Sequence, residues 1–246
     1  MNILAIESSG TVAGVAVMEG DKLKASSYID TKLTHSTTLM PLVDKTLNAA
    51  GMDVAEIGLI GVSKGPGSFT GLRIGAGTAK GLAIALNCDI APVSTLQVLA
   101  QELSYFDGII CPIMNARRNQ VYTCIYRWDF ENDCLKPLSD EMAVDINDLF
   151  KELEKYSEKI IFTGDGVDVF YDTLQNDFKN NYKKEFIINH KEKRNQNPVN
   201  VAIISKRMFE ENKCIKVQEF KPEYLRKSQA EREREAALKE ESKEEN

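Results

Sequence analysis

The stretch at 64–81, KGPGSFTGLRIGAGTAKG, constrains the fold more than any other part of this chain. An apolar run at 57–62 leads into it and predicts a short buried strand. The glycines and the proline at 65–67 then require a tight turn, because proline fixes φ and glycine allows positive φ. Ser68 is a good helix N-cap, and the small residues that follow predict a helix to about Leu86. The stretch therefore predicts a strand, a tight turn and a helix packed on a sheet.

Three glycines, Gly71, Gly75 and Gly77, interrupt the predicted helix. Each lowers helix stability by up to ~1 kcal/mol relative to alanine. Such a cost indicates the close approach of another backbone, a ligand or a partner chain, and the sequence leaves these three alternatives open. A glycine-rich turn at a helix N-terminus also offers free N–H groups to an anion. The turn is not a P-loop, however, because Lys64 precedes the glycines and no Gly-Lys-Ser or Gly-Lys-Thr follows.

The composition indicates a soluble globular protein without an overall affinity for nucleic acid. The 246 residues suit one large domain or two small ones, and 43% of them are hydrophobic and 28% charged. The formal net charge of −6 gives no global basic footprint for RNA or DNA, although it leaves room for a local basic patch.

The five cysteines are widely spaced and form no Cys-x-x-Cys pair, which argues against a structural zinc site. They are interpreted as reduced thiols in a cytoplasmic protein. The N-terminal apolar run ends at Glu7, too soon for a signal peptide, and no apolar run approaches membrane-spanning length. A cytoplasmic location is therefore expected.

Apolar runs and helical periods predict an α/β chain in which one order of elements occurs twice. The first series has three strands, a helix, a strand, a helix, a strand and a helix, at 3–6, 11–18, 23–30, 35–51, 57–62, 69–86, 90–93 and 95–103. Pro41 lies in the first turn of its helix if that helix begins near Leu39. The second series has three strands, a helix, a strand and a helix, at 108–114, 120–127, 133–142, 146–156, 159–163 and 167–174. This order indicates an internal duplication.

The repeated order predicts two subdomains and a tail. Residues 1–103 form the first subdomain, which carries the GPGSFTG motif. Residues 104–226 form the second, with a further helix at 197–212 and a return across the halves at 217–225. Residues 227–246 mix charges of both signs with few large apolar residues, which is typical of a frayed helix or a disordered tail. An arm that docks a partner or contacts RNA is the less favoured alternative for this tail.

The run at 65–83, GPGSFTGLRIGAGTAKGLA, closely resembles the signature of the TsaB (YeaZ) family, bacterial partners in making threonylcarbamoyladenosine on tRNA. The runs ILAIE at 3–7, PVSTL at 92–96 and YLR at 224–226 fit the same family. The duplicated order of elements resembles the actin/Hsp70/sugar-kinase (ASKHA, ribonuclease H-like) fold. In that superfamily, two α/β halves flank a nucleotide cleft.

This resemblance implies at most a vestigial nucleotide site. In ATP-using members of the superfamily, carboxylates after the first strand of each half help hairpin loops to hold phosphates and a metal. The corresponding residues here are Glu7, Ser8, Gly67 and Ser68 in the first half and Asn115, Gly164 and Gly166 in the second. Asn115 stands where an aspartate is common in related sequences, and an amide adds no negative charge to a hard-cation site. Independent ATP hydrolysis is therefore not expected.

Neither a metal site nor a serine nucleophile is expected in this chain. The sister family TsaD, which performs the chemistry, binds metal through histidines, and the matching positions here are Thr95 and Leu99, which are poor ligands. His35 is interpreted as a capping or surface residue, and His190 as a solvated loop residue. Ser68 does not lie in a G-x-S-x-G motif, and a helix-cap role accounts for it.

The resemblance implies a subunit without catalytic residues of its own. It would bind TsaD and support threonylcarbamoyl transfer to adenosine 37 of ANN-decoding tRNAs, as a required subunit of the transferase complex. TsaE would dock on the assembly, TsaC would act in the same pathway, and ATP and a metal ion would bind to partner subunits. A homodimer is a further expectation, and tRNA is expected to bind mainly through the complex. The alternative is a free-standing ATPase, kinase or glycoprotease-like enzyme of the same superfamily.

The expected partner interface lies on the first two long helices. In relatives, these helices form the contact with TsaD and an overlapping self-pairing surface. One stripe of each helix should face the protein's own sheet and another should reach a partner. The expected contact residues, taken to be exposed in the monomer, are Leu39, Val43, Leu47, Gly71, Gly75 and Thr78.

Overall fold

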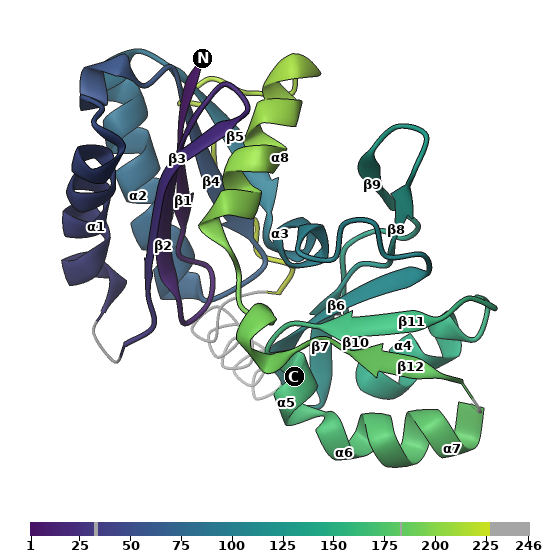
Figure 1. Ribbon diagram of the computed structural model, residues 1–246. Coiled ribbons are helices and arrows are strands. Elements are labelled where there is room, and N and C mark those ends of the chain that lie inside the picture. The colour runs from purple at the N-terminus through teal and green to yellow at the C-terminus, as the bar shows by residue number, and fades with distance from the viewer. Residues whose placement is uncertain (32–33, 183, 227–246) are drawn as a thin grey trace, which may run out of the picture.

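Two mixed β-sheets organise the computed structural model, which describes residues 1–31, 34–182 and 184–226 (Figure 1). The first sheet has the strand order β3-β2-β1-β4-β5 and the second has the order β10-β7-β6-β11-β12, with β8 pairing to β6 and β9. The strands of the first sheet are β1 (Asn2–Glu7), β2 (Ala13–Glu19), β3 (Lys22–Ile29), β4 (Leu59–Gly65) and β5 (Asp89–Ser94). Those of the second are β6 (Ile109–Arg117), β7 (Gln120–Thr123), β8 (Tyr126–Asp129), β9 (Cys134–Pro137), β10 (Met142–Asp145), β11 (Ile160–Thr163) and β12 (Phe186–Ile188).

The two sheets repeat one topology. In each, the first strand pairs antiparallel with the second and parallel with the fourth, and the fifth strand pairs parallel with the fourth. The third strand pairs antiparallel with the second in both sheets. The hairpin β8–β9 is inserted between the second and third strands of the second sheet. The predicted duplication of an α/β unit is therefore confirmed.

The prediction of one strand at 120–127 is wrong in one respect, because the chain forms two strands there, β7 and β8. Between β7 and β8, the backbone N–H of Ile125 donates to Ser139 Oγ at 3.0 Å, and its carbonyl accepts from the N–H of Leu138 at 2.7 Å. These contacts draw the chain out of one ladder and into another, where β8 pairs with β9. The region predicted as one strand at 133–142 likewise gives β9 and the start of β10, and β12 was not predicted.

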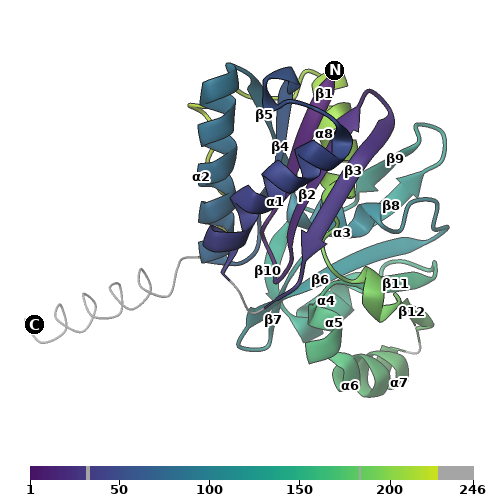
Figure 2. The same ribbon diagram turned by 60° about the vertical axis from the view of Figure 1, so that its left-hand side comes forward.

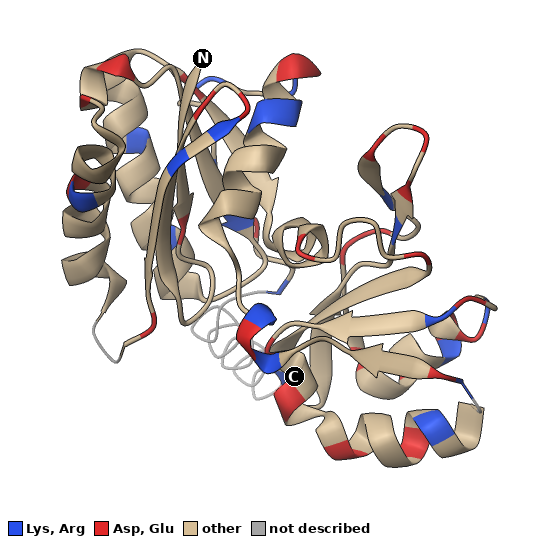
Figure 3. Cartoon of the chain, viewed as in Figure 1, with Lys and Arg blue, Asp and Glu red and all other residues tan. Residues whose placement is uncertain are grey.

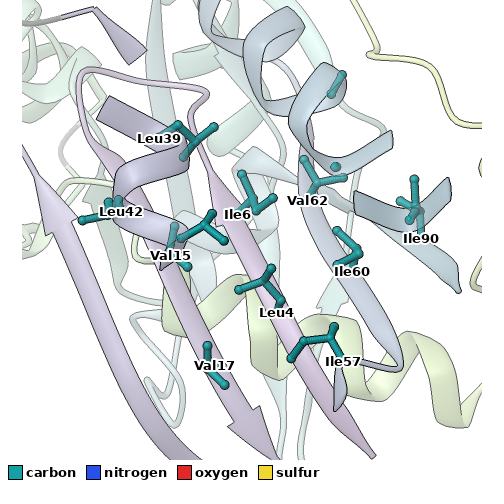
Figure 4. Close-up of a cluster of buried hydrophobic side chains, with 14 of the residues drawn as sticks. Leu4, Ile6, Val15, Val17, Leu39, Leu42, Ile57, Ile60, Val62 and Ile90 are labelled. Carbon is teal, nitrogen blue, oxygen red and sulfur yellow. The ribbon is translucent and has the colours of Figure 1, made fainter. Parts of the chain in front are cut away.

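Alternating side chains of the first sheet build two core layers. Leu4 and Ile6 pack on one face with the helices α1 (His35–Ala50) and α2 (Phe69–Leu86), as Figure 4 shows. Ile3 and Ala5 pack on the other face with α3 (Thr95–Gln101) and α8 (Pro198–Glu210) (Figure 2). This period of two follows from strand geometry. Complete burial of each leucine or isoleucine contributes about 1.5–3 kcal/mol.

Helix α1 begins at His35, four residues before Leu39, which is the start that would place Pro41 in the first turn. Pro41 therefore lies inside the helix. Pro41 is exposed, as is Thr37 one turn before it, so water can reach the carbonyl that proline leaves without its helical donor. Gly51 ends the helix as predicted, with φ of +64° and its N–H bonded to Asn48 O.

The helical part of the second half is more broken than predicted. After α4 (Ile146–Leu153), the expected helix at 167–174 is replaced by α5 (Gly166–Val169), α6 (Tyr171–Thr173), a π-helical segment (Leu174–Phe178) and α7 (Lys179–Tyr182). Two 3₁₀ turns complete the helices, at Val54–Glu56 and Lys191–Lys193. The ring of Phe178 lies 4.8 Å from that of Phe150 and 5.5 Å from that of Phe162. These rings form the centre of the second core.

The chain returns to the first sheet earlier than residue 217, where the sequence predicts the return. Helix α8 already packs on that sheet, and Ile215 then forms an antiparallel bridge with Ile90. Phe220 is fully buried in the core beneath α1 and α2. Beyond it, Arg226 donates to the carbonyl of Ala116 in β6 at 2.7 Å, so the return segment touches both halves. The division at residues 103 and 104 stays a prediction, and the tail at 227–246 lies outside the described residues.

None of the helices in the described ranges has the length and apolar character needed to cross a membrane.

Candidate functional site

Glu7, at the end of β1, has no exposed surface. Its Oε1 accepts hydrogen bonds from the backbone N–H and the hydroxyl of Ser9, at 2.6 and 2.5 Å, and its Oε2 accepts one from the hydroxyl of Ser63. Burial raises the pKa of Glu7, and these hydrogen bonds oppose that rise. Both carboxylate oxygens are therefore occupied by the protein's own donors.

The glycines of the turn and of α2 let this segment lie directly on the loop after β1. A Cβ added to Gly67 would be 2.4 Å from Ser9 O, and one added to Gly71 would be 2.1 Å from Ser8 O. A Cβ on Gly75 would be 2.2 Å from Ser8 Oγ. Of the three alternatives that the sequence leaves open, the close approach of the protein's own chain therefore explains Gly71 and Gly75.

Gly77 differs from these glycines. Within the described chain, no atom outside its own helix lies within 4 Å of a Cβ added there. Gly81, one turn further along α2, is open in the same way. Helix α2 therefore has one glycine face that packs inward and one that faces solvent.

Ser68 caps α2 as predicted. Its Oγ accepts from the N–H of Gly71 at 3.3 Å, and its own N–H donates to Ser9 O at 2.7 Å. His35, the first residue of α1, places Nε2 3.0 Å from the carbonyl oxygen of Gly10, where the ring N–H donates. Donors at the start of α1 and at the start of α2 therefore hold the loop after β1.

The second half repeats the arrangement with different chemistry. Asn115 lies in β6, its Oδ1 accepts from the N–H of Arg117 at 2.8 Å, and its own N–H donates to Asp165 at 3.3 Å. A Cβ added to Gly164 or Gly166 would lie 2.3 or 2.8 Å from the carbonyl oxygen of Ile113. The glycines after the fourth strand therefore permit close packing in both halves, on the loop after β1 in the first half and on strand β6 in the second.

Gln196 connects the two groups of residues. It is buried, and its Oε1 would lie 2.4 Å from a Cβ added to Gly10 in the first half. Its Nε2 lies 3.9 Å from Met114 Sδ, one residue before Asn115 in the second half. The side chain thus fills the space between the loop after β1 and the equivalent strand β6.

These residues do not fit a nucleotide with its metal ion. The Glu7 carboxylate is enclosed, the Asn115 amide oxygen accepts from the backbone, and Gln196 lies between the loop after β1 and strand β6. In the described part of the chain, no three side chains of His, Cys, Asp or Glu are grouped so that they could hold a metal ion.

Five of the six residues expected at the partner interface are buried. Leu39, Val43 and Leu47 belong to the core that α1 shares with its own sheet, and Gly71 and Gly75 are buried against Ser8. The expectation of exposure in the monomer is wrong for these five residues, because both apolar stripes of α1 face inward. Thr78 is half-buried. The assignment of the contact to these helices stays a prediction.

Two residues of the site were not found from the sequence. Ser63 directly follows the apolar run that ends at Val62 and precedes Lys64, so the sequence groups it with the polar turn and gives no sign of its contact with Glu7. Gln196 lies in a polar segment without periodicity, where nothing distinguishes it from its neighbours.

Comparison with known proteins identifies the family. A family model described as "TsaD: tRNA N6-adenosine threonylcarbamoyltransferase" matches residues 30–234. The chain is 34% identical to "tRNA threonylcarbamoyladenosine biosynthesis protein TsaB" of Bacillus subtilis over 94% of this chain and 96% of that protein. It is 26% identical to the protein of the same name from Escherichia coli, over 94% and 96%. The structure titled "YeaZ from Pseudomonas aeruginosa" superposes with a TM-score of 0.76 at 20% identity, over 91% of this chain and 99% of that one.

The likeness to that structure and the repeated strand order agree on a duplicated actin/Hsp70/sugar-kinase-like α/β fold, as predicted. The sequence identity to the Bacillus subtilis protein, which extends over almost the whole of both chains, then shows which family of this large fold class the chain belongs to. The chain belongs to the TsaB (YeaZ) family of tRNA threonylcarbamoyladenosine biosynthesis proteins.

Proposed function

We propose that this chain is a non-catalytic scaffold subunit that binds TsaD. In this role it supports threonylcarbamoyl transfer to adenosine 37 of ANN-decoding tRNAs. The observation that carries the proposal is the closed site: Glu7 is enclosed, and Gln196 lies between the loop after β1 and strand β6. A chain that keeps a duplicated fold but uses its own residues to fill the site is better suited to binding a partner than to catalysis.

The proposed contact uses the outward faces of α1 and α2. Met40 on α1 and Ile84 on α2 expose 49% and 67% of their surfaces. Gly77 and Gly81 lie on the solvent side of α2, where a partner helix can approach closely. Figure 2 shows α1 and α2 together on the outside of the first sheet. A second copy of this chain is the alternative occupant of the same face.

The remaining components of the proposed assembly supply what this chain lacks. ATP and a metal ion bind to partner subunits, TsaE docks on the complex, and TsaC provides the activated threonylcarbamoyl donor. The tRNA binds mainly through the complex. A subunit with a formal net charge of −6 is consistent with this division.

Reconstitution of the modification tests the proposal. Purified TsaD, TsaE and TsaC are incubated with threonine, bicarbonate, ATP and an unmodified tRNA that reads an ANN codon, with and without this chain. Modified adenosine is expected only when the chain is present. Equal product in both reactions would refute the scaffold role, and failure of the chain to copurify with TsaD would refute the proposed partner.

A further inference from the structure

A groove of about 880 Å³ lies in the second half, beside the edge strand β12. Its volume is within the range of ~300–1,000 Å³ that is typical of ligand sites. The three residues of β12 form one wall, and the segments that contain Tyr171, Gln175 and Lys179 form another. This groove is separate from the site of Glu7 and Gln196, and none of the functional residues discussed above lines it.

The charge of the groove is opposite to that of the whole chain. Lys159, Lys179, Lys184 and Arg194 line it, against one lining carboxylate, Glu185. In Figure 3, α7 and the segments on either side of β12 carry Lys or Arg. The local basic patch that the composition left open is therefore present, on a chain whose formal net charge is −6.

Two of these four cationic side chains are held by other groups of the protein, and two are available to bind a ligand. Lys184 donates to the backbone carbonyls of Glu154, at 3.1 Å, and Tyr156, which fix its ammonium group without neutralising it. Arg194 pairs with Asp168 at 2.6 Å. Lys159 and Lys179 are exposed, and neither forms an ion pair with a described residue.

The other lining groups favour a nucleic acid over a peptide. Tyr171 lines the groove, exposes 47% of its surface and can stack on a base. Gln175 and Asn180 add amide donors. Strand β12 has just three residues, which gives an added peptide strand few backbone hydrogen bonds.

We propose that this groove binds the phosphate backbone of the tRNA. Lys159 and Lys179 contact phosphates directly, while Lys184 supplies a fixed positive charge. This inference rests on the proposed function, because it places a tRNA contact on the scaffold subunit. The groove and the pair α1–α2 lie on different halves (Figure 1), so a partner can contact those helices without contacting the groove.

The double variant Lys159→Ala/Lys179→Ala tests the proposal in the assembled complex with TsaD. We expect the Kd for an unmodified ANN-decoding tRNA transcript to rise about tenfold near physiological salt, because two phosphate contacts are lost. The slope of log Kd against log salt should fall by about one per lysine. The variant Lys159→Arg/Lys179→Arg keeps both charges and should retain wild-type affinity.

The matched control is Lys22→Ala/Lys136→Ala, which removes two exposed lysines on β3 and β9, away from the groove. It should leave both the Kd and the slope unchanged. If the groove variant binds tRNA as the control does, the proposal is wrong. If the groove variant instead fails to bind TsaD, the groove is a protein interface and the RNA assignment is equally wrong.

The two proposals fail separately. Loss of the scaffold role appears as modification that does not require this chain. Loss of the groove proposal appears as normal complex formation and normal tRNA affinity in the Lys159→Ala/Lys179→Ala variant.

Discussion

The hydroxyl of Ser8 donates a hydrogen bond to the carbonyl oxygen of Gly71, 2.9 Å away, and so joins the loop after the first strand to the second long helix. The contact forms because Gly71 has no side chain, since a Cβ there would lie 2.1 Å from the carbonyl oxygen of Ser8. Ser8, which lies 63 positions away in the sequence, thus restricts position 71 to glycine.

The first prediction compares two glycines of α2. Gly71→Ala should lower the free energy of unfolding by about 1–3 kcal/mol, because the new methyl group meets the backbone at Ser8. Gly77→Ala, whose methyl group meets no described neighbour, should raise it by up to ~1 kcal/mol through better helix propensity. Urea unfolding of both variants measures the difference, and equal effects would contradict the packing described for Gly71.

The second prediction concerns Glu7 and pH. Burial raises the pKa of Glu7 in the folded protein above its ordinary value of 4.5, so between those two values the folded state binds more protons than the unfolded state. Stability relative to Glu7→Gln should therefore fall as pH rises from about 4.5 through the raised value, by up to about 1.4 kcal/mol per pH unit. Denaturant unfolding of both proteins between pH 4.5 and 8 provides the test. A difference that does not change with pH would show that burial does not control this carboxyl.

The third prediction concerns the return segment. Phe220 is fully buried beneath α1 and α2, so Phe220→Ala should cost about 3–5 kcal/mol of stability. Phe209, on α8, exposes 46% of its surface and provides a control of the same chemistry, whose replacement by alanine should cost clearly less. Thermal unfolding of the two variants tests whether the return segment belongs to the core. Similar losses would argue against the position of Phe220.

The fourth prediction separates folding from assembly. Met40→Glu and Ile84→Glu alter exposed positions, so both variants should fold normally yet lose affinity for TsaD by orders of magnitude, because the contact would bury an unpaired charge. Ile203→Glu, at an exposed position on α8, should bind as the wild type does. Binding is measured by calorimetry and folding by circular dichroism. Wild-type affinity in both variants would move the interface elsewhere.

The fifth prediction concerns nucleotide. Because Gln196 lies between the loop after β1 and strand β6 and both oxygens of Glu7 are occupied, the isolated chain should show no binding heat with millimolar Mg-ATP. Tight binding with turnover that Glu7→Ala abolishes would instead support the alternative of a free-standing ATPase.

The sequence predicted the elements whose causes are local. The turn before Ser68, the cap itself and the end of α1 at Gly51 follow from residues within one turn of chain, and all three are as expected. The break between β7 and β8 was missed because its cause, Ser139, lies 14 residues from Ile125.

The candidate site likewise contains residues that a local motif identifies and residues whose position depends on distant parts of the chain. Glu7 and the glycine-rich turn were recognisable from their motifs, but the direction in which Gly71 and Gly75 face depends on the loop that packs against them. Gln196 reaches the site from a segment near the other end of the chain, and pairing over that range is not encoded in any local pattern.

The two glycine faces of α2 mean that substitutions along a single helix are subject to different constraints. Side chains added at Gly71 or Gly75 collide with the protein's own loop, so folding itself excludes them in any setting. Side chains added at Gly77 or Gly81 meet open space, so an isolated monomer tolerates them. Retention of glycine at those two positions would therefore indicate that a neighbouring molecule packs there. A substitution at either position would then alter assembly without lowering the stability of the monomer.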